Sequence, residues 1–166
     1  MPNSMWTPSG LYILRSGPNA GKSLEYLLLH DPAKIVLMRQ ALEKNASSTS
    51  HLNEYHNHLL WLVEQIEKLS HNLPCCCCEQ PAEVILALGD SRQGYTPLPK
   101  VYCKSCAEAE IAKHRQLGTI VSLSPWGLRY FQCKKDMKRV WQVICDLLNI
   151  RRLKDQALFE RLKTIN

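Results

Sequence analysis

The sequence predicts a mostly helical α+β protein, and three features of the 166-residue chain support that prediction. Apolar residues recur at helical spacing over much of the first 72 residues. Two Cys-x-x-Cys pairs, which begin at Cys75 and end at Cys106, enclose a stretch with the pattern of a β-hairpin. Helical periodicity then returns. We expect a small strand-turn-helix module, a central hairpin and a helical C-terminal region, in that order.

The composition allows a compact core. Hydrophobic residues make up 45% of the chain, which is too many for wholesale disorder. No run approaches the roughly 18 apolar residues of a membrane span. The N-terminus also lacks the basic and long apolar regions of a secretory signal. We therefore expect a cytoplasmic protein with no membrane association.

Positive charge is concentrated in the last third of the chain. Residues 1–106 contain nine Lys or Arg and nine Asp or Glu, whereas residues 107–166 contain twelve and six. The whole net charge of +6 therefore arises after residue 106. Such an excess suits an anionic partner such as nucleic acid, and a solvated helical surface is the alternative.

The N-terminal module begins with a short expected strand at residues 11–15 and a turn at residues 16–21, which contain Gly, Pro and Asn. Ser23 is expected to cap a short helix. Asp31 and Pro32 suit the N-cap and first position of the next helix.

A long amphipathic helix is expected to follow a polar loop and to end near residue 71. Its apolar stripe consists of Leu52, Tyr55, Leu59, Leu62, Val63, Ile66 and Leu69. Such a stripe forms either a core or a docking surface. A protein-interaction adaptor is therefore an alternative function.

Residues 16–23 nearly match the phosphate-binding loop Gly-x-x-x-x-Gly-Lys-Ser/Thr. In that interpretation Lys22 would reach phosphates and Ser23 would hold magnesium. However, Ser16 replaces the first Gly, and Asp31 with Pro32 interrupts the helix that follows. A nucleotide hydrolase is therefore a further alternative, and a non-catalytic protein is the main expectation.

The central segment predicts a metal site. A strand at residues 82–88, a tip at 89–94 and a return at 95–102 separate the two cysteine pairs. Pairs with this spacing can place four thiolates tetrahedrally around one zinc ion. The zinc would be structural, because four thiolates leave no position for water. The predicted ligands are Cys75, Cys78, Cys103 and Cys106.

Alternatives to this ligand set remain open. Cys76, Cys77 or His71 could replace one ligand, whereas His114 is expected on the surface. Disulfides or a redox pair are also conceivable, but paired cysteines in a cytosolic chain more often bind metal.

The C-terminal region is expected to contain an extended link at residues 118–123, a helix at 126–150 and a final amphipathic segment at 153–165. Cys133 and Cys145 are expected to be small buried residues of this region. Nucleic-acid phosphates would contact a basic strip together with the lysine of the glycine turn. These residues are Lys22, Arg129, Lys134, Lys135, Lys138 and Arg139.

Two resemblances add to these expectations. The run Gly-Lys-Ser-Leu-Glu from Gly21, followed by Asp31 and Pro32, resembles the C-terminal domain of exodeoxyribonuclease X-like proteins over residues 11–42. It implies an accessory module linked to nucleic-acid enzymes, without nuclease activity, because the catalytic domain of that family has no counterpart here.

The central segment resembles a treble-clef zinc finger in the order of its parts. The turn with Cys75 and Cys78, which would be the zinc knuckle, is followed by a hairpin, the second cysteine pair and a helix. This resemblance implies that Cys103 and Cys106 lie at the start of a helix. Glu79 stands where the usual Gly follows the second cysteine of the knuckle.

We thus expect an N-terminal module (residues 1–72), a zinc finger (73–117) and a basic helical region (118–166). The leading function is a non-catalytic protein with one structural Zn²⁺ that binds DNA or assists a DNA-processing enzyme. A protein partner is also possible.

Overall fold

A computed structural model gives the fold of the chain. It describes residues 6–44, 53–69, 73–90, 98–115, 118–122 and 134–165. Several residues considered from the sequence lie outside the described residues: Leu52, His71, Arg129, Cys133 and most of the hairpin tip.

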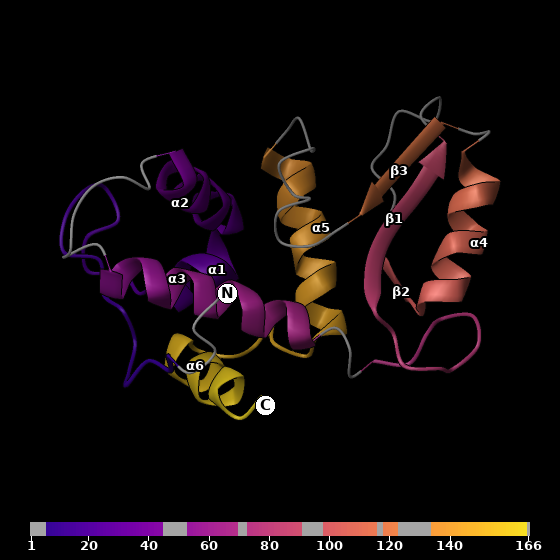
Figure 1. The fold of residues 1–166 in the computed structure, drawn as a ribbon. Coiled ribbons are helices and arrows are strands. Elements are labelled where there is room, and N and C mark those ends of the chain that lie inside the picture. The colour runs from indigo at the N-terminus through magenta and orange to yellow at the C-terminus, as the bar shows by residue number, and fades with distance from the viewer. Residues whose placement is uncertain are drawn as a thin grey trace. The chain divides into compact units, whose positions relative to one another are not determined.

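The described residues form a mostly helical α+β structure, which confirms the predicted fold class (Figure 1). The elements in chain order are α1 (Leu24–His30), α2 (Pro32–Lys44), α3 (Asn53–Leu69), β1 (Val84–Asp90), β2 (Lys100–Tyr102), α4 (Lys104–His114), β3 (Gly118–Ser122), α5 (Lys134–Leu147) and α6 (Asp155–Lys163). No helix of the described residues is long and apolar enough to cross a membrane.

The chain divides into two compact units. Residues 1–66 and 152–166 form one, which we call the helical unit, and residues 67–151 form the other, which we call the sheet unit. The division by sequence into three regions did not anticipate that residues 152–166 group with the N-terminal residues.

The helical unit has a core made by four helices. Its fully buried side chains include Leu24, Leu27 and Leu28 of α1, Ile35 of α2, Leu59, Leu62 and Ile66 of α3, and Leu158, Phe159 and Leu162 of α6. Helix α1 contacts both α2 and α6. The apolar stripe of α3 is therefore used within the core of the protein itself.

The turn before α1 is tight. Leu14 N–H donates to Lys22 O (3.0 Å), and Gly21 N–H donates to Leu14 O (2.8 Å). Gly17 and Gly21 have φ angles of 81° and 83°, a left-handed region that glycine adopts at little cost. The expected strand at residues 11–15 contributes one isolated bridge, between Ile13 and Ser23, because the returning chain enters α1 at once.

The sheet unit contains a three-stranded antiparallel sheet with the order β2-β1-β3. The expected hairpin is present, with Val84 opposite Tyr102 and Ile85 opposite Val101. The segment expected as an extended link forms β3, which pairs along the other edge of β1 from Leu86 to Asp90. Strand β1 lies between the other two strands, and its run of successive apolar residues suits this central position. Helix α4 contacts β1 and lies alongside the sheet (Figure 1).

Helix α5 ends at Leu147, three residues before the expected end. Asn149 has a φ of 54°, and Ile150 N–H turns back to Cys145 O (2.8 Å). Asn often occupies this left-handed position at helix ends. Cys145 is buried, as predicted.

Candidate metal centre

The first cysteine pair lies in a tight turn between β-bridged residues. Pro74 and Pro81 form an isolated antiparallel bridge, and inside it Cys75 N–H donates to Gln80 O at 2.7 Å. Glu79 N–H then donates to Cys75 O (3.2 Å), and Cys77 N–H points to Cys75 Sγ (3.4 Å). The turn therefore places an amide donor next to a sulfur, which favours the thiolate form.

Glu79 closes this turn with an unusual backbone conformation. Its φ is 61°, which is left-handed and unfavourable for a residue with a Cβ atom. A zinc knuckle usually has Gly at this position. The φ of Glu79 lies in a region that Gly adopts at little cost.

The second pair lies at the start of α4. Cys103 follows β2 directly and is the N-cap of α4, with extended backbone angles (φ −71°, ψ 165°) and no side-chain capping bond. Its carbonyl accepts the first helical hydrogen bond, from Ala107 N–H (2.9 Å). The Cys103 sulfur is thus not used as a helix cap, and it lies near a helix N-terminus, which favours negative charge. Cys106 lies within the first turn.

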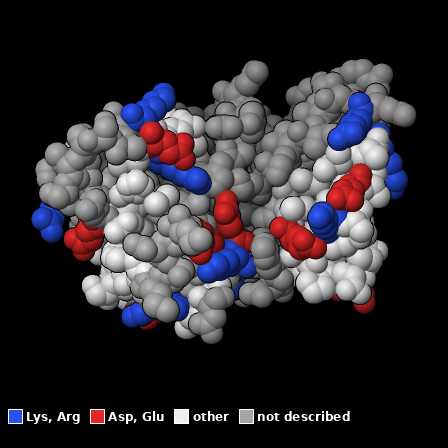
Figure 2. Space-filling model, viewed as in Figure 1, with Lys and Arg blue, Asp and Glu red and all other residues white. Residues whose placement is uncertain are grey.

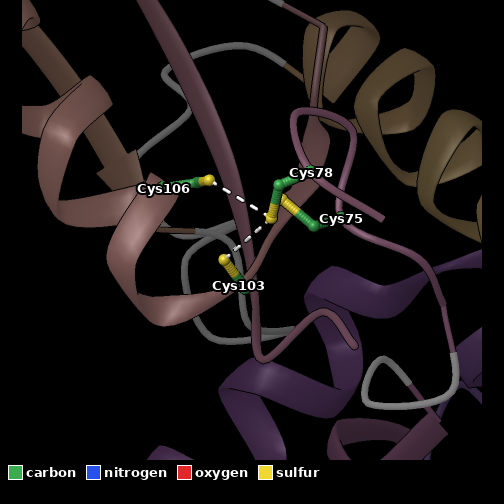
Figure 3. A group of neighbouring side chains, drawn as sticks. All are labelled: Cys75, Cys78, Cys103 and Cys106. Atoms are coloured by element: carbon green, nitrogen blue, oxygen red, sulfur yellow. Dashed lines mark hydrogen bonds between the residues drawn. The ribbon is translucent and has the colours of Figure 1, made fainter. Parts of the chain in front are cut away.

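The four predicted sulfurs converge. The ligand atoms of Cys75, Cys78, Cys103 and Cys106 all lie within 4.8 Å of one another. Figure 3 shows the side chains from the turn and from α4 pointing toward a common centre. Cys78 Sγ lies 3.6 Å from Cys103 Sγ and 3.5 Å from Cys106 Sγ.

These distances suit a single bound ion. A tetrahedral site with Zn–S bonds of about 2.3 Å separates its sulfurs by about 3.8 Å. A disulfide would instead require about 2.05 Å. All four cysteines are free thiols. The donor set therefore fits one metal ion with only a small adjustment of the side chains.

The centre adjoins the small apolar core of the sheet unit. Cys75 and Cys103 are 3% and 6% exposed, and they belong to a buried cluster with Leu86, Tyr102 and Ala107. Cys106 is half-buried and Cys78 is exposed. The metal would thus connect the core to the surface turn.

The surroundings of the sulfurs divide them into two groups by acidity. Burial raises the pKa of the Cys75 thiol, but backbone hydrogen bonds with Cys103 and Cys77 outweigh it and lower that pKa to about 6. The pKa of Cys103 is lowered, mainly by a hydrogen bond with the Ser105 side chain and to a smaller extent by one with the Cys106 backbone. Hydrogen bonds with the sulfurs of Cys78 and Cys103 raise the pKa of Cys106. A metal ion would replace the protons that remain.

The alternative ligands take other positions. Cys76 and Cys77 are both exposed, with their sulfurs 3.7 Å apart, and neither belongs to the four-sulfur group. His114 lies outside that group as well, and its Nε2 is 3.9 Å from Glu110 Oε2.

The glycine turn holds Ser23 as a helix cap. Tyr26 N–H donates to Ser23 Oγ (2.9 Å), and the Ser23 hydroxyl donates to Asp155 Oδ2 (3.0 Å). The residue is 1% exposed, so a magnesium ion could not reach this hydroxyl without breaking the cap. Lys22 is exposed, with its Nζ 5.6 Å from the centre of the Tyr26 ring.

The predicted basic strip is described only in part. Lys138 and Arg139 are exposed on α5. Lys134 and Lys135 begin that helix, but their side chains, like Arg129, lie outside the described part of the chain. Among the described residues on the face in Figure 2, Lys and Arg are interspersed with Asp and Glu.

Sequence reasoning missed a buried polar pair in the helical unit. His58 Nε2 lies 2.6 Å from Glu25 Oε1, and the two side chains are almost fully buried. The residues are 33 positions apart, so no local spacing could have revealed the pair.

No family model, no curated protein and no solved structure matches the chain. The geometry of the site therefore defines the class: a protein whose four cysteines are positioned to bind a single metal ion.

Proposed function

We propose that the chain is a non-catalytic zinc protein in which one structural Zn²⁺ holds the sheet unit together. The convergence of the Cys75, Cys78, Cys103 and Cys106 sulfurs carries this proposal. Two sulfurs come from a surface turn and two from the start of α4, so the ion would join segments 25 or more residues apart.

Zinc is the metal that the donor set favours. Four thiolates in a tetrahedral arrangement select zinc or iron among common biological metals, and zinc requires no redox chemistry to be retained. When bound, the ion would supply folding free energy rather than an open coordination position. The chain contributes two thiols with lowered pKa and a helix N-terminus.

Metal content tests the first part of the proposal. Native mass spectrometry of the full chain should show one zinc ion per molecule, and elemental analysis should show zinc in preference to iron. A visible absorption spectrum typical of iron–thiolate bonds would contradict zinc. A chain without a stoichiometric metal would contradict the whole assignment.

We further propose that the protein associates with nucleic acid, either as a DNA-binding protein or as an accessory to a DNA-processing enzyme. The charge excess after residue 106 and the exposed Lys138 and Arg139 support this proposal. The resemblance over residues 11–42 points in the same direction. In either role the protein would bind nucleic acid without catalysing a reaction on it.

Salt-dependent binding tests the second part. Affinity for single- and double-stranded DNA should fall as salt rises, with a logarithmic slope of about −0.7 to −0.9 for each neutralised phosphate. Lys138→Gln should reduce that slope, whereas Lys104→Gln, an equal charge change at an exposed position of α4, should affect it less. Absence of binding at low salt would refute nucleic-acid association and leave the zinc assignment unaffected.

A further inference from the structure

The helical unit contains a buried polar pair, and one of its members, His58, lines a cavity. Glu25, in the first turn of α1, is 0% exposed, and His58 of α3 is 2% exposed. Their short contact satisfies one carboxylate oxygen. The other, Oε2, is buried without a hydrogen-bond partner among the described residues. Burial of an incompletely paired carboxylate is costly, so the packing around this pair requires an explanation.

Several aromatic rings pack around His58, and the Phe159 ring stacks on it, with centroids 6.2 Å apart and planes inclined at 19°. The Trp6 and His58 rings have centroids 6.1 Å apart with planes inclined at 70°. The Tyr12 ring lies 5.9 Å from His58 at 55°. Tyr55 lies 5.5 Å beyond Tyr12. Two of these rings, Trp6 and Tyr12, also line a cavity together with His58.

The cavity beside these rings has a volume of about 290 Å³. Trp6, Tyr12 and His58 line it together with the backbone segment between residues 6 and 12 and with Glu54. Glu54 and His58 are four residues apart on α3 and therefore lie on one face of that helix. The cavity thus combines aromatic rings, a histidine and a carboxylate that is itself exposed.

The electrostatic balance of the cavity is negative. Among the described residues that line it, Glu54 carries a negative charge and none is Lys or Arg. The carboxylate of Glu54 therefore makes the site attract cations and repel anions.

We propose that this cavity binds a small organic ammonium ion. Aromatic faces attract cations through their negative quadrupole, and a neighbouring carboxylate strengthens that attraction. The cavity is at the small end of ligand-site volumes, which suits an ammonium headgroup rather than a large cofactor. This site lies in the helical unit, and it does not depend on the metal centre or on nucleic-acid binding.

Choline provides a direct probe. The full-length zinc-loaded protein would be titrated with choline chloride, with sodium chloride reduced to hold ionic strength constant. The indole N–H signal of Trp6 would be followed by NMR. The parallel titration uses the uncharged carbon isostere of choline, in which a carbon atom replaces the ammonium nitrogen. We expect saturable binding of choline. The affinity for the isostere should be about 2-fold to 30-fold weaker than the affinity for choline.

Two variants test whether the residues named here form the site. Glu54→Gln removes the charge of the exposed carboxylate and should weaken choline binding several-fold. Glu43→Gln makes the same change at an exposed position of α2 that does not line the cavity, and should leave affinity unchanged. Tyr12→Leu should weaken binding by about 2-fold to 30-fold, while Tyr12→Phe, which keeps the ring, should preserve most of it.

Three results would overturn the proposal. The first is the absence of a saturable shift of the Trp6 signal. The second is equal affinity for choline and its uncharged isostere, which would indicate binding by apolar contact alone. The third is choline binding that neither Glu54→Gln nor Tyr12→Leu weakens, which would place it elsewhere. Because Glu54 is exposed, its substitution should leave the fold intact, and a thermal melt would verify this.

Discussion

The sulfur atoms of Cys78 and Cys106 lie 3.5 Å apart although 28 residues separate them in the chain. One belongs to an exposed surface turn and the other to the first turn of α4. Thiols without a shared ion gain little from such proximity, because each sulfhydryl group is a weak hydrogen-bond donor. Together with the sulfurs of Cys75 and Cys103, they are positioned to bind a single metal ion.

Cys103→Ser should abolish stoichiometric zinc binding and destabilise the sheet unit. Structural zinc sites contribute apparent binding free energies of about 10–16 kcal/mol, and the loss of one of the four thiolates should remove part of it. Native mass spectrometry and circular dichroism would measure both effects. Cys76→Ser is the matched control, because its exposed sulfur lies outside the four-sulfur group. If the control lost zinc equally, the ligand set would need revision.

Zinc affinity should increase with pH. The metal must replace the proton of Cys106, whose pKa is raised by hydrogen bonds with Cys78 and Cys103. Below the Cys75 pKa of about 6, that thiol also becomes protonated, so each further fall in pH should release zinc more steeply. Competition with a zinc-sensitive dye, at pH values above and below the Cys75 pKa of about 6, would measure how the zinc affinity changes. An affinity independent of pH would show that the sulfurs are not the ligands.

Glu79→Gly should stabilise the zinc-loaded protein. A left-handed residue with a Cβ atom costs roughly 1–2 kcal/mol, and Gly removes this cost while losing about 0.5–1 kcal/mol through the entropy of the unfolded chain. The expected net gain is therefore about 0–1.5 kcal/mol, and its central value would raise the midpoint of thermal unfolding by a few degrees.

Glu79→Ala is the appropriate comparison. It removes the carboxylate but keeps the Cβ atom and therefore the strain at φ 61°. If Ala stabilised the protein as much as Gly, the charge of Glu79 rather than its backbone conformation would be responsible.

The cysteines should differ in their reaction with an alkylating reagent. Cys76 and Cys77 are exposed and should react first in the zinc-loaded protein, whereas the four ligands should become reactive only after zinc is chelated. Burial raises the pKa of Cys145 to about 12, so this thiol should remain unreactive until the protein unfolds. Mass spectrometry of peptides would assign each modification. Early labelling of Cys145 would contradict its buried position.

Ser23→Ala should lower the free energy of unfolding by about 1–2 kcal/mol, because it removes the cap of α1 and leaves Asp155 without that hydrogen bond. Lys22→Ala, at the preceding exposed position, should have an effect of less than about 0.5 kcal/mol. Chemical denaturation would compare the two. If both variants were equally stable, the hydroxyl would not act as a cap.

The features that the sequence predicted well are those that local spacing determines. Ser23 and Pro32 mark the starts of helices through short-range chemistry, and the i, i+3 spacing of Cys75 and Cys78 follows from one turn. The convergence of the four sulfurs was predictable because a hairpin brings its two ends together. Each of these signals lies within a few residues or within one hairpin.

Long-range pairings were not predictable in this way. The strand β3 has a short apolar sequence, and only its pairing with β1 distinguishes it from an extended link. Glu25 and His58 carry no common motif, and their contact depends on how α1 and α3 pack. The early end of α5 depends on the left-handed conformation of Asn149, which many sequences can adopt or avoid.

The hydrogen bond between Ser23 and Asp155 has a consequence for how the protein is made. Because residues 152–166 complete the same unit as residues 1–66, the sheet unit is an insertion within the helical one. During synthesis the metal-binding segment emerges from the ribosome before α6 does. The cysteine turn and α4, which are positioned to bind a metal ion, therefore leave the ribosome before α6 can cover the apolar face of α1.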